Sequence, residues 1–120
     1  MFFKWTKGRQ DSGYEKIKLL ESNLLKFDLY LIRFKEGSRI DSHKDPVEGH
    51  EHHRLNVVLK HAKIGGEFEM QLNNFFHEKT KKTFTYFRPD MYSHKVHEIE
   101  KGTRYVLSFG WLRSKNEISR

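Results

Sequence analysis

The residues best suited to chemistry in this chain are His43, Asp45, His94 and Arg104. Two imidazoles and one carboxylate form a ligand set that binds a divalent metal such as Fe(II) and leaves coordination positions open. A guanidinium such as that of Arg104 grips the far carboxylate of a diacid through two parallel hydrogen bonds. If the fold brings these side chains together, the sequence predicts a metal centre with an anion site beside it.

The elements that must position these residues have the character of short strands. Stretches that are apolar or alternate in polarity recur between turn signals. They are residues 15–20, 26–34, 54–59, 67–72, 83–87, 95–99 and 104–112. Residues 14–25 also have a rough helical spacing, but Ser22-Asn23 favours a hairpin turn between the first two stretches. The sequence therefore predicts an all-β fold with little helix, a small double-stranded β-helix (jelly roll, cupin-like).

Strand geometry suggests how the candidate ligands converge. His43 and Asp45 are two residues apart, so on one strand their side chains point to the same face. His94 precedes the predicted strand 95–99, which in a jelly roll can lie beside the first pair. Arg104 heads an apolar stretch, where a buried guanidinium needs an anion. The alternative is a rim arginine paired with a surface glutamate.

Other histidines offer competing sites. The run 50–53 (His-Glu-His-His) is dense enough to hold a metal by itself, but we interpret it as a polar loop or strand edge. His97 follows His94 by three residues, so on a strand the two face opposite sides and His97 is expected outside the metal site. We interpret His61 and His77 as surface residues.

Composition narrows the class of protein. A length of 120 residues suits one domain, residues 1–120. The absence of cysteine excludes disulfides, thiolate catalysis and cysteine-based zinc sites, and is expected in a reducing cytoplasm. There is no signal-peptide core and no apolar run near the roughly 20 residues that span a bilayer. We therefore expect a cytoplasmic protein without membrane contact.

The net charge of +7 attracts anions, so nucleic acid is a possible partner. A solvated basic surface explains the charge equally well. Exposed aromatic side chains interleaved with Lys and Arg would support nucleic-acid binding. The ten Phe, five Tyr and two Trp lie mostly in strand patterns, so we expect them in the core.

Four motifs, in the same order and spacing, resemble the Fe(II)/2-oxoglutarate-dependent dioxygenases, especially the prolyl-hydroxylase-like group. They are residues 30–45, ending in His43-Lys-Asp45; residues 54–59; the turn Gly65-Gly66-Glu67-Phe68; and residues 94–104, from the distal His to the Arg. The resemblance extends roughly over residues 27–112. It implies Fe(II) on the two histidines and the aspartate, and the distal carboxylate of 2-oxoglutarate on the arginine.

The resemblance also implies further site residues. Tyr30 and Asn56 lie on strands that can line the pocket, where either can add a hydrogen bond to the co-substrate. Val106 stands where the family often has a serine that provides a second contact, so that contact is missing or comes from elsewhere.

The expected activity is hydroxylation of a C–H bond of an unidentified substrate, with 2-oxoglutarate and O2 consumed and succinate and CO2 released. The alternative is a cupin-type metal-binding protein, an isomerase or small-molecule sensor, because one fold serves both classes. A cupin usually has a second histidine in place of Asp45 and does not require Arg104. Open edge strands make a homodimer plausible.

Overall fold

The computed structural model describes residues 4–8, 12–73 and 75–114, and these contain strands but no helix. The large sheet contains, in spatial order, β1 (Thr6–Lys7), β2 (Glu15–Ser22), β3 (Phe27–Phe34), β12 (Arg104–Ser114), β5 (His50–Lys60) and β9 (Phe84–Phe87). The smaller sheet contains β4 (Ile40–His43), β10 (His94–Val96), β7 (Phe68–Gln71) and β8 (His77–Thr80). β11 (Ile99–Lys101) and β6 (Ile64–Gly65) form a short two-stranded sheet.

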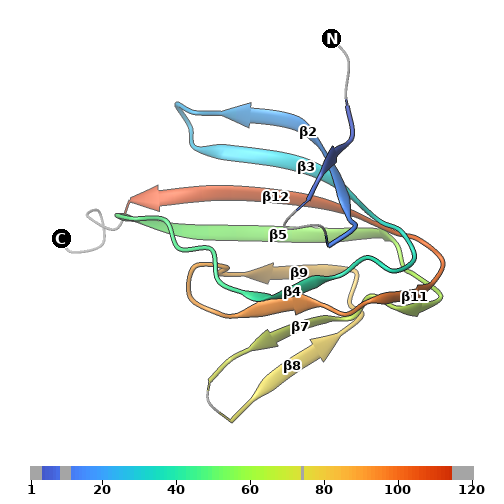
Figure 1. The fold of residues 1–120 in the computed structure, drawn as a ribbon. Helices are drawn as coiled ribbons and strands as arrows, with labels where there is room; N and C mark the ends of the chain where they lie inside the picture. Colours follow the sequence, from blue (N-terminus) through green and yellow to red (C-terminus); the bar gives the residue numbers. More distant parts are fainter. Residues whose placement is uncertain (1–3, 9–11, 74, 115–120) are drawn as a thin grey trace.

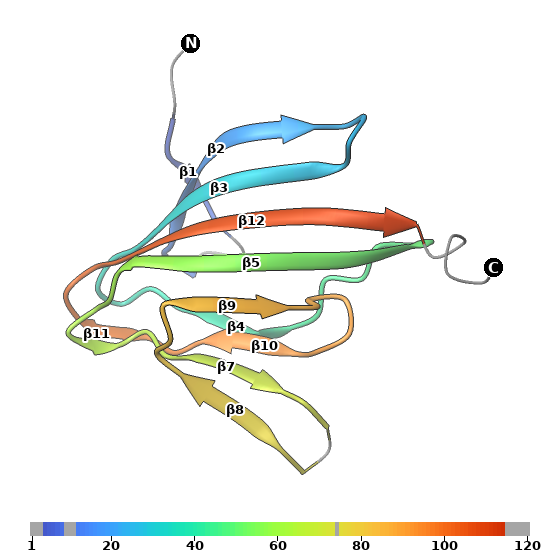
Figure 2. The same cartoon turned by 180° about the vertical axis from the view of Figure 1, so that it is seen from behind.

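The two larger sheets form the two layers of a jelly roll, which confirms the predicted all-β fold (Figure 1). The view from behind shows the same arrangement, with β3, β12 and β5 side by side across one layer (Figure 2). Most boundaries differ from the predicted ones by a few residues, and β1, β4, β6 and β8 fall outside the predicted stretches. The stretch 95–99 is divided between β10 and β11, and β5 begins four residues before the predicted strand 54–59. Within the described ranges, no helix is available to cross a membrane.

The region with rough helical spacing forms a β-hairpin, as predicted. β2 and β3 pair antiparallel and are joined by residues 23–26. The backbone N–H of Leu25 donates to Ser22 Oγ (3.0 Å), and Lys26 closes the turn in the left-handed region at φ 57°. The strand pairing wins over helical spacing because β2 pairs with β3 on one side and with the short β1 on the other, which satisfies its backbone groups.

The hydrophobic core lies between the two layers. Phe34 and Val106 from the large sheet and Ile99 from the short one are each no more than 1% exposed. Burying one such side chain contributes about 1.5–3 kcal/mol to folding. Beside this core, polar side chains from both layers line a cavity, described below.

The prediction that the aromatic side chains belong to the core is wrong for much of the large sheet. Phe84, Tyr86 and Phe109 are 65%, 54% and 38% exposed. The Phe109 ring lies 5.8 Å from Phe27 and 5.4 Å from Trp111, measured between centroids. These residues alternate along their strands with the inward-facing ones, so they lie on the outer face of the sheet.

Candidate metal centre and anion site

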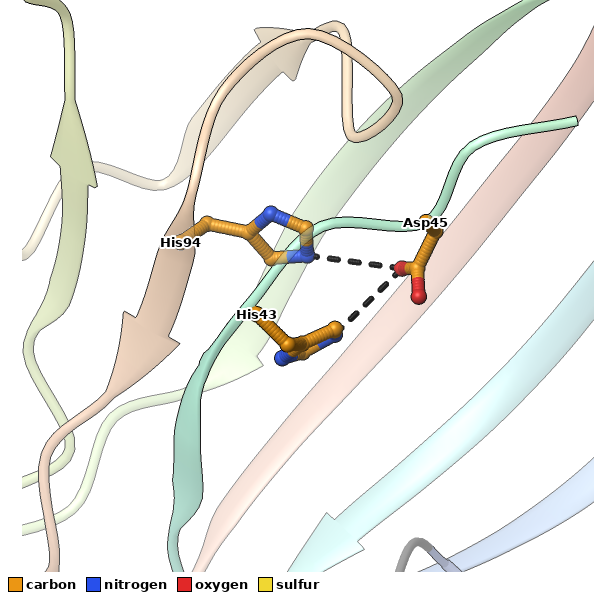
Figure 3. Close-up of side chains that lie close together, drawn as sticks. All are labelled: His43, Asp45 and His94. Atoms are coloured by element: carbon orange, nitrogen blue, oxygen red, sulfur yellow. Dashed lines mark ion pairs between the residues drawn. The ribbon is translucent and has the colours of Figure 1, made fainter.

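The two histidines of the candidate metal centre lie on neighbouring strands. β4 and β10 pair antiparallel, with His43 directly opposite His94 and the ring centroids 4.4 Å apart. The expected proximity of these strands is therefore present. β4 ends at His43, so Asp45 is not on the strand that the same-face argument assumed. Its backbone N–H instead donates to the carbonyl of Pro89 (2.7 Å), which turns the loop so that the carboxylate faces both imidazoles (Figure 3).

The separations of the three side chains suit a metal ion. Asp45 Oδ2 lies 3.3 Å from His43 Nε2 and 3.5 Å from His94 Nε2. All three ligand atoms lie within 4.8 Å of one another. Two atoms that each bind one ion at about 2.1 Å and at right angles are about 3 Å apart. The donor set therefore fits one divalent ion after small side-chain shifts.

Backbone carbonyls fix which nitrogen each imidazole presents. His43 Nδ1–H donates to the carbonyl of Asp41 (2.8 Å), and His94 Nδ1–H donates to the carbonyl of Tyr92 (2.9 Å). Because a carbonyl only accepts, the proton of each neutral ring is on Nδ1. Nε2 of each ring then faces Asp45. It donates to the carboxylate when the ring is protonated, and it offers its lone pair to an ion when the ring is neutral, which is the arrangement that orients histidines in metal sites.

Asp45 is held in its charged form. Burial raises the pKa of this carboxyl, but hydrogen bonds and attraction from His43 and His94 have the larger effect. The net result is a pKa below the usual range for aspartate. Asp45 is therefore an anion at neutral pH, as a metal ligand must be.

Arg104 is a buried cation beside the metal centre. It is the first residue of β12, is only 5% exposed and lies 4.8 Å from the centroid of the Phe34 ring. Burial lowers the pKa of its guanidinium to about 10, so it remains charged at neutral pH. In the part of the chain that is described, no carboxylate forms an ion pair with it. The alternative of a rim arginine paired with a glutamate is therefore wrong, and the side chain has the environment of an anion site.

The candidate metal ligands His43, Asp45 and His94 line one cavity of about 260 Å³ between the layers together with Arg104. This volume lies just below the range of about 300–1,000 Å³ for drug-sized ligand sites, so it suits a small metabolite. Tyr30 on β3 and Asn56 on β5 also line it. Asn56 Oδ1 is buried without a hydrogen-bond partner among the described residues. A group bound in the cavity would change the surroundings of this amide.

Sequence reasoning missed several polar residues of the cavity. Arg54 lines it and donates from Nη1 to Ser108 Oγ and from Nη2 to Asp28 Oδ1, both at 2.7 Å. Gly110 makes room for this guanidinium, since a Cβ there would collide with Nη2. The alternation of side chains along a strand could have identified Arg54. It is two residues from Asn56, so both side chains point to the same side of β5.

The histidine run 50–53 forms the first part of β5 and is not a loop. It pairs with β12 on one side, whereas the pairing with β9 on the other side begins only at Arg54, so the strand-edge alternative holds. Alternation along β5 separates the ring directions. His52 lines the cavity, and burial lowers the pKa of its ring. His53 points to the outer face and stacks on Trp111, with 5.4 Å between ring centroids.

The remaining histidines lie away from the triad. His97 Nε2 contacts Glu69 Oε1 at 2.7 Å, and His77 contacts the other oxygen of the same carboxylate at 2.9 Å. Neither histidine lines the cavity. Among the described residues, His43, Asp45 and His94 are the one group of histidine and carboxylate side chains close enough together to hold an ion.

Comparison with solved structures shows the fold. A prolyl-4-hydroxylase from Pseudomonas putida superposes with a TM-score of 0.71 at 13% identity, covering 93% of this chain and 78% of that one. The cupin domain of Schizosaccharomyces pombe Cnp3 gives a TM-score of 0.62 at 11% identity, covering 97% and 72%. The viral collagen prolyl hydroxylase of Paramecium bursaria Chlorella virus-1, solved as a 2-oxoglutarate complex, gives 0.59 at 17% identity, covering 85% and 80%.

No protein-family model matches this sequence. No curated protein matches it either. The chain thus has the double-stranded β-helix fold that prolyl hydroxylases and cupins share, with a His-His-Asp group that could bind a metal.

Proposed function

We propose that this chain is an Fe(II)- and 2-oxoglutarate-dependent oxygenase in which residues 1–120 act as one domain. One observation carries the proposal: the cavity that holds the His-His-Asp group also holds the buried, charged Arg104, which has no carboxylate partner among the described residues. A metal alone accounts for the ligand group but leaves the guanidinium unexplained. A dicarboxylate co-substrate accounts for both, because one end can reach the metal while the other pairs with Arg104.

The residues then have separate tasks. His43 and His94 present their Nε2 atoms, and Asp45 supplies the negative charge that helps retain a divalent cation. When bound, iron supplies the oxidative decarboxylation of 2-oxoglutarate by O2, which releases succinate and CO2 and places an oxygen atom on a substrate C–H bond. Arg104 binds the distal carboxylate in a two-point contact and so fixes the direction of the co-substrate. The Tyr30 hydroxyl and the Asn56 amide are further donors toward it.

The surroundings of Arg104 strengthen such a contact. The neighbouring Phe34 and Val106 side chains are almost completely buried, so water competes weakly for the guanidinium. Val106 provides no hydroxyl of the kind that the family resemblance led us to expect. Ser108 is two residues further along the same face of β12 and also lines the cavity. Its Oγ accepts a hydrogen bond from Arg54, so its hydroxyl proton can donate elsewhere.

A second candidate function is a cupin-type metal-binding protein, an isomerase or small-molecule sensor that does not use 2-oxoglutarate. The similarity to a cupin domain at a TM-score of 0.62 and the valine at position 106 favour this alternative. Arg104 would then bind a different small anion beside the metal.

Anaerobic titration separates the two functions. The apoprotein is loaded with Fe(II) and then titrated with 2-oxoglutarate, whose metal chelate has a weak visible charge-transfer band. The oxygenase proposal predicts that the band saturates at one equivalent, and that admission of O2 with a suitable substrate yields succinate. A 2-oxo acid without the distal carboxylate is the matched control and should bind much more weakly. A protein that binds Fe(II) but gives no band with 2-oxoglutarate would support the cupin function instead.

A further inference from the structure

The three central strands of the large sheet place their more apolar side outward. On β12, Arg104 and Ser108 face the cavity, whereas Leu107 and Phe109 point away from it. On β5, Arg54 and Asn56 likewise line the cavity while the residues between them point outward. A solvated sheet normally has the opposite pattern, with apolar side chains inward and polar ones outward. The outward side is therefore built to be covered.

The strand register makes this outward surface continuous. Phe109 lies opposite Leu29 on β3 and opposite Leu55 on β5, and Leu55 lies opposite Tyr86 on β9. The next row contains Trp111 opposite Phe27. We call the surface centred on Phe27, Leu29, Leu55, Tyr86, Phe109 and Trp111 the outer apolar face.

Charged residues flank the outer apolar face at the strand ends. Arg33 lies opposite Tyr105 at one end, where it pairs with Glu15, and Arg113 lies opposite Glu51 at the other. In the described part of the chain, the second layer, which includes β4, β10 and β7, packs on the other side of the large sheet (Figures 1 and 2). No described strand covers the outer apolar face.

We propose that the outer apolar face binds the same face of a second copy of this chain, which gives a symmetric dimer. The partly exposed side chains of this face offer on the order of 500 Å² per chain, so a pair would bury on the order of 1,000 Å² in total, the lower bound for a specific interface. A two-fold axis lets one surface be its own complement. Because the centre of the face has no Lys, Arg, Asp or Glu, the dimer buries no unpaired charge there, even though each chain has a net charge of +7.

Nucleic acid is the competing occupant, because exposed aromatic rings on a basic protein can stack on bases. The leucines that alternate with the rings, such as Leu29 and Leu55, offer a base neither a ring to stack on nor a hydrogen bond. The cations that would hold phosphates lie at the ends of the strands, and one of them, Arg33, is paired with Glu15. The surface therefore favours a second copy.

The test is the oligomeric state of the full chain between about 1 and 100 µM, measured by sedimentation equilibrium. We expect a mass of twice 14.5 kDa. Phe109→Glu places a charge at the centre of the outer apolar face and should raise the dimer dissociation constant at least about 100-fold. The matched control is Phe76→Glu, a 64% exposed position between β7 and β8, which should remain dimeric.

Circular dichroism and metal content check that each variant is folded. If Phe109→Glu does not fold, Tyr86→Lys at a 54% exposed position provides the same test. A parent that is monomeric at 100 µM overturns the proposal. So does a dimer that both face variants leave intact, which would indicate pairing through sheet edges. A monomer that binds a labelled single-stranded oligonucleotide, and loses it in Phe109→Glu, would assign the face to nucleic acid instead.

Discussion

Replacing Arg104 by Met tests the proposed co-substrate site most directly. Methionine keeps much of the volume of the side chain and removes the charge, so the metal ligands should stay in place. The proposal predicts that the variant binds Fe(II) like the parent and binds 2-oxoglutarate far more weakly. The physical reason is the loss of a charge-assisted two-point contact in a site from which water is largely excluded.

The structure sets the magnitude. Burial lowers the pKa of Arg104 from its usual value to about 10, which corresponds to a cost of about 3 kcal/mol for keeping the guanidinium charged in the folded protein. A bound carboxylate can recover a cost of this size. Removing one partner of a desolvated charge pair typically costs 2–5 kcal/mol, so we expect a loss of about 2–4 kcal/mol, or roughly 30- to 900-fold in the dissociation constant.

The same numbers predict the effect on folding. A base whose pKa is lowered by folding destabilises the protein at every pH at which it is charged, here throughout the neutral range. Arg104→Met removes this cost, so the free energy of unfolding of the apoprotein should change little or rise. Arg104→Lys keeps a charge without the planar fork and should recover only part of the 2-oxoglutarate affinity.

The assay is anaerobic titration of the Fe(II)-loaded variants with 2-oxoglutarate, followed by the charge-transfer band, with urea denaturation of the apoproteins in parallel. Equal 2-oxoglutarate affinity in Arg104→Met and parent would refute the reasoning about this guanidinium. Loss of metal in Arg104→Met would show instead that the arginine supports the ligands, and the argument for an anion site would fail.

Three further predictions concern the ligands, a glycine and an acid-sensitive pair. Alanine at any of the three proposed metal ligands should abolish stoichiometric Fe(II) binding, measured by metal analysis. The control His97→Ala should still bind Fe(II), and loss of the metal in this variant would reject the ligand assignment. Gly66→Ala should lower the free energy of unfolding by about 1–3 kcal/mol more than Gly37→Ala does. Both glycines have positive φ, but only at Gly66 would the new Cβ lie 2.7 Å from a core methyl group. Equal urea midpoints for the two variants would contradict this. Burial raises the pKa of Asp90, but its hydrogen bonds with Arg88 and with backbone groups, together with the attraction of Arg88, outweigh burial and lower the pKa. Asp90 therefore stabilises the fold above pH about 4, and this contribution is lost in acid. Asp90→Asn should therefore lower the free energy of unfolding by about 1.5–3 kcal/mol at pH 7 and make it depend less on pH in acid. An unchanged pH dependence in acid would exclude this role of Asp90.

The sequence by itself was enough for the fold class and for the location of the long strands β2, β3, β5 and β12 along the chain. Alternating β-branched and aromatic residues between glycine and asparagine turns are sufficient to indicate short strands. The hairpin between β2 and β3 was also predictable from its turn residues. Residue chemistry alone singled out His43, Asp45, His94 and Arg104, because few other combinations of side chains make a metal site beside an anion site.

Only the tertiary structure decided how those residues meet. Asp45 reaches the histidines through a loop that hydrogen-bonds to Pro89, a contact between segments 44 residues apart that no local pattern encodes. The hydrogen bonds of Arg54 with Asp28 and Ser108 also depend on tertiary structure, because strand pairing brings three strands that are distant in sequence into register.

Tertiary structure also determined which face of each strand points toward the cavity and which points outward. Alternation divides the residues of β12 into two sets but does not say which set is inside when both contain apolar side chains. The more apolar set, with Leu107, Phe109 and Trp111, looked like the core and lies outside. The set with Arg104 and Ser108 lies inside, where Val106 between them packs in the core and the two polar side chains line the cavity.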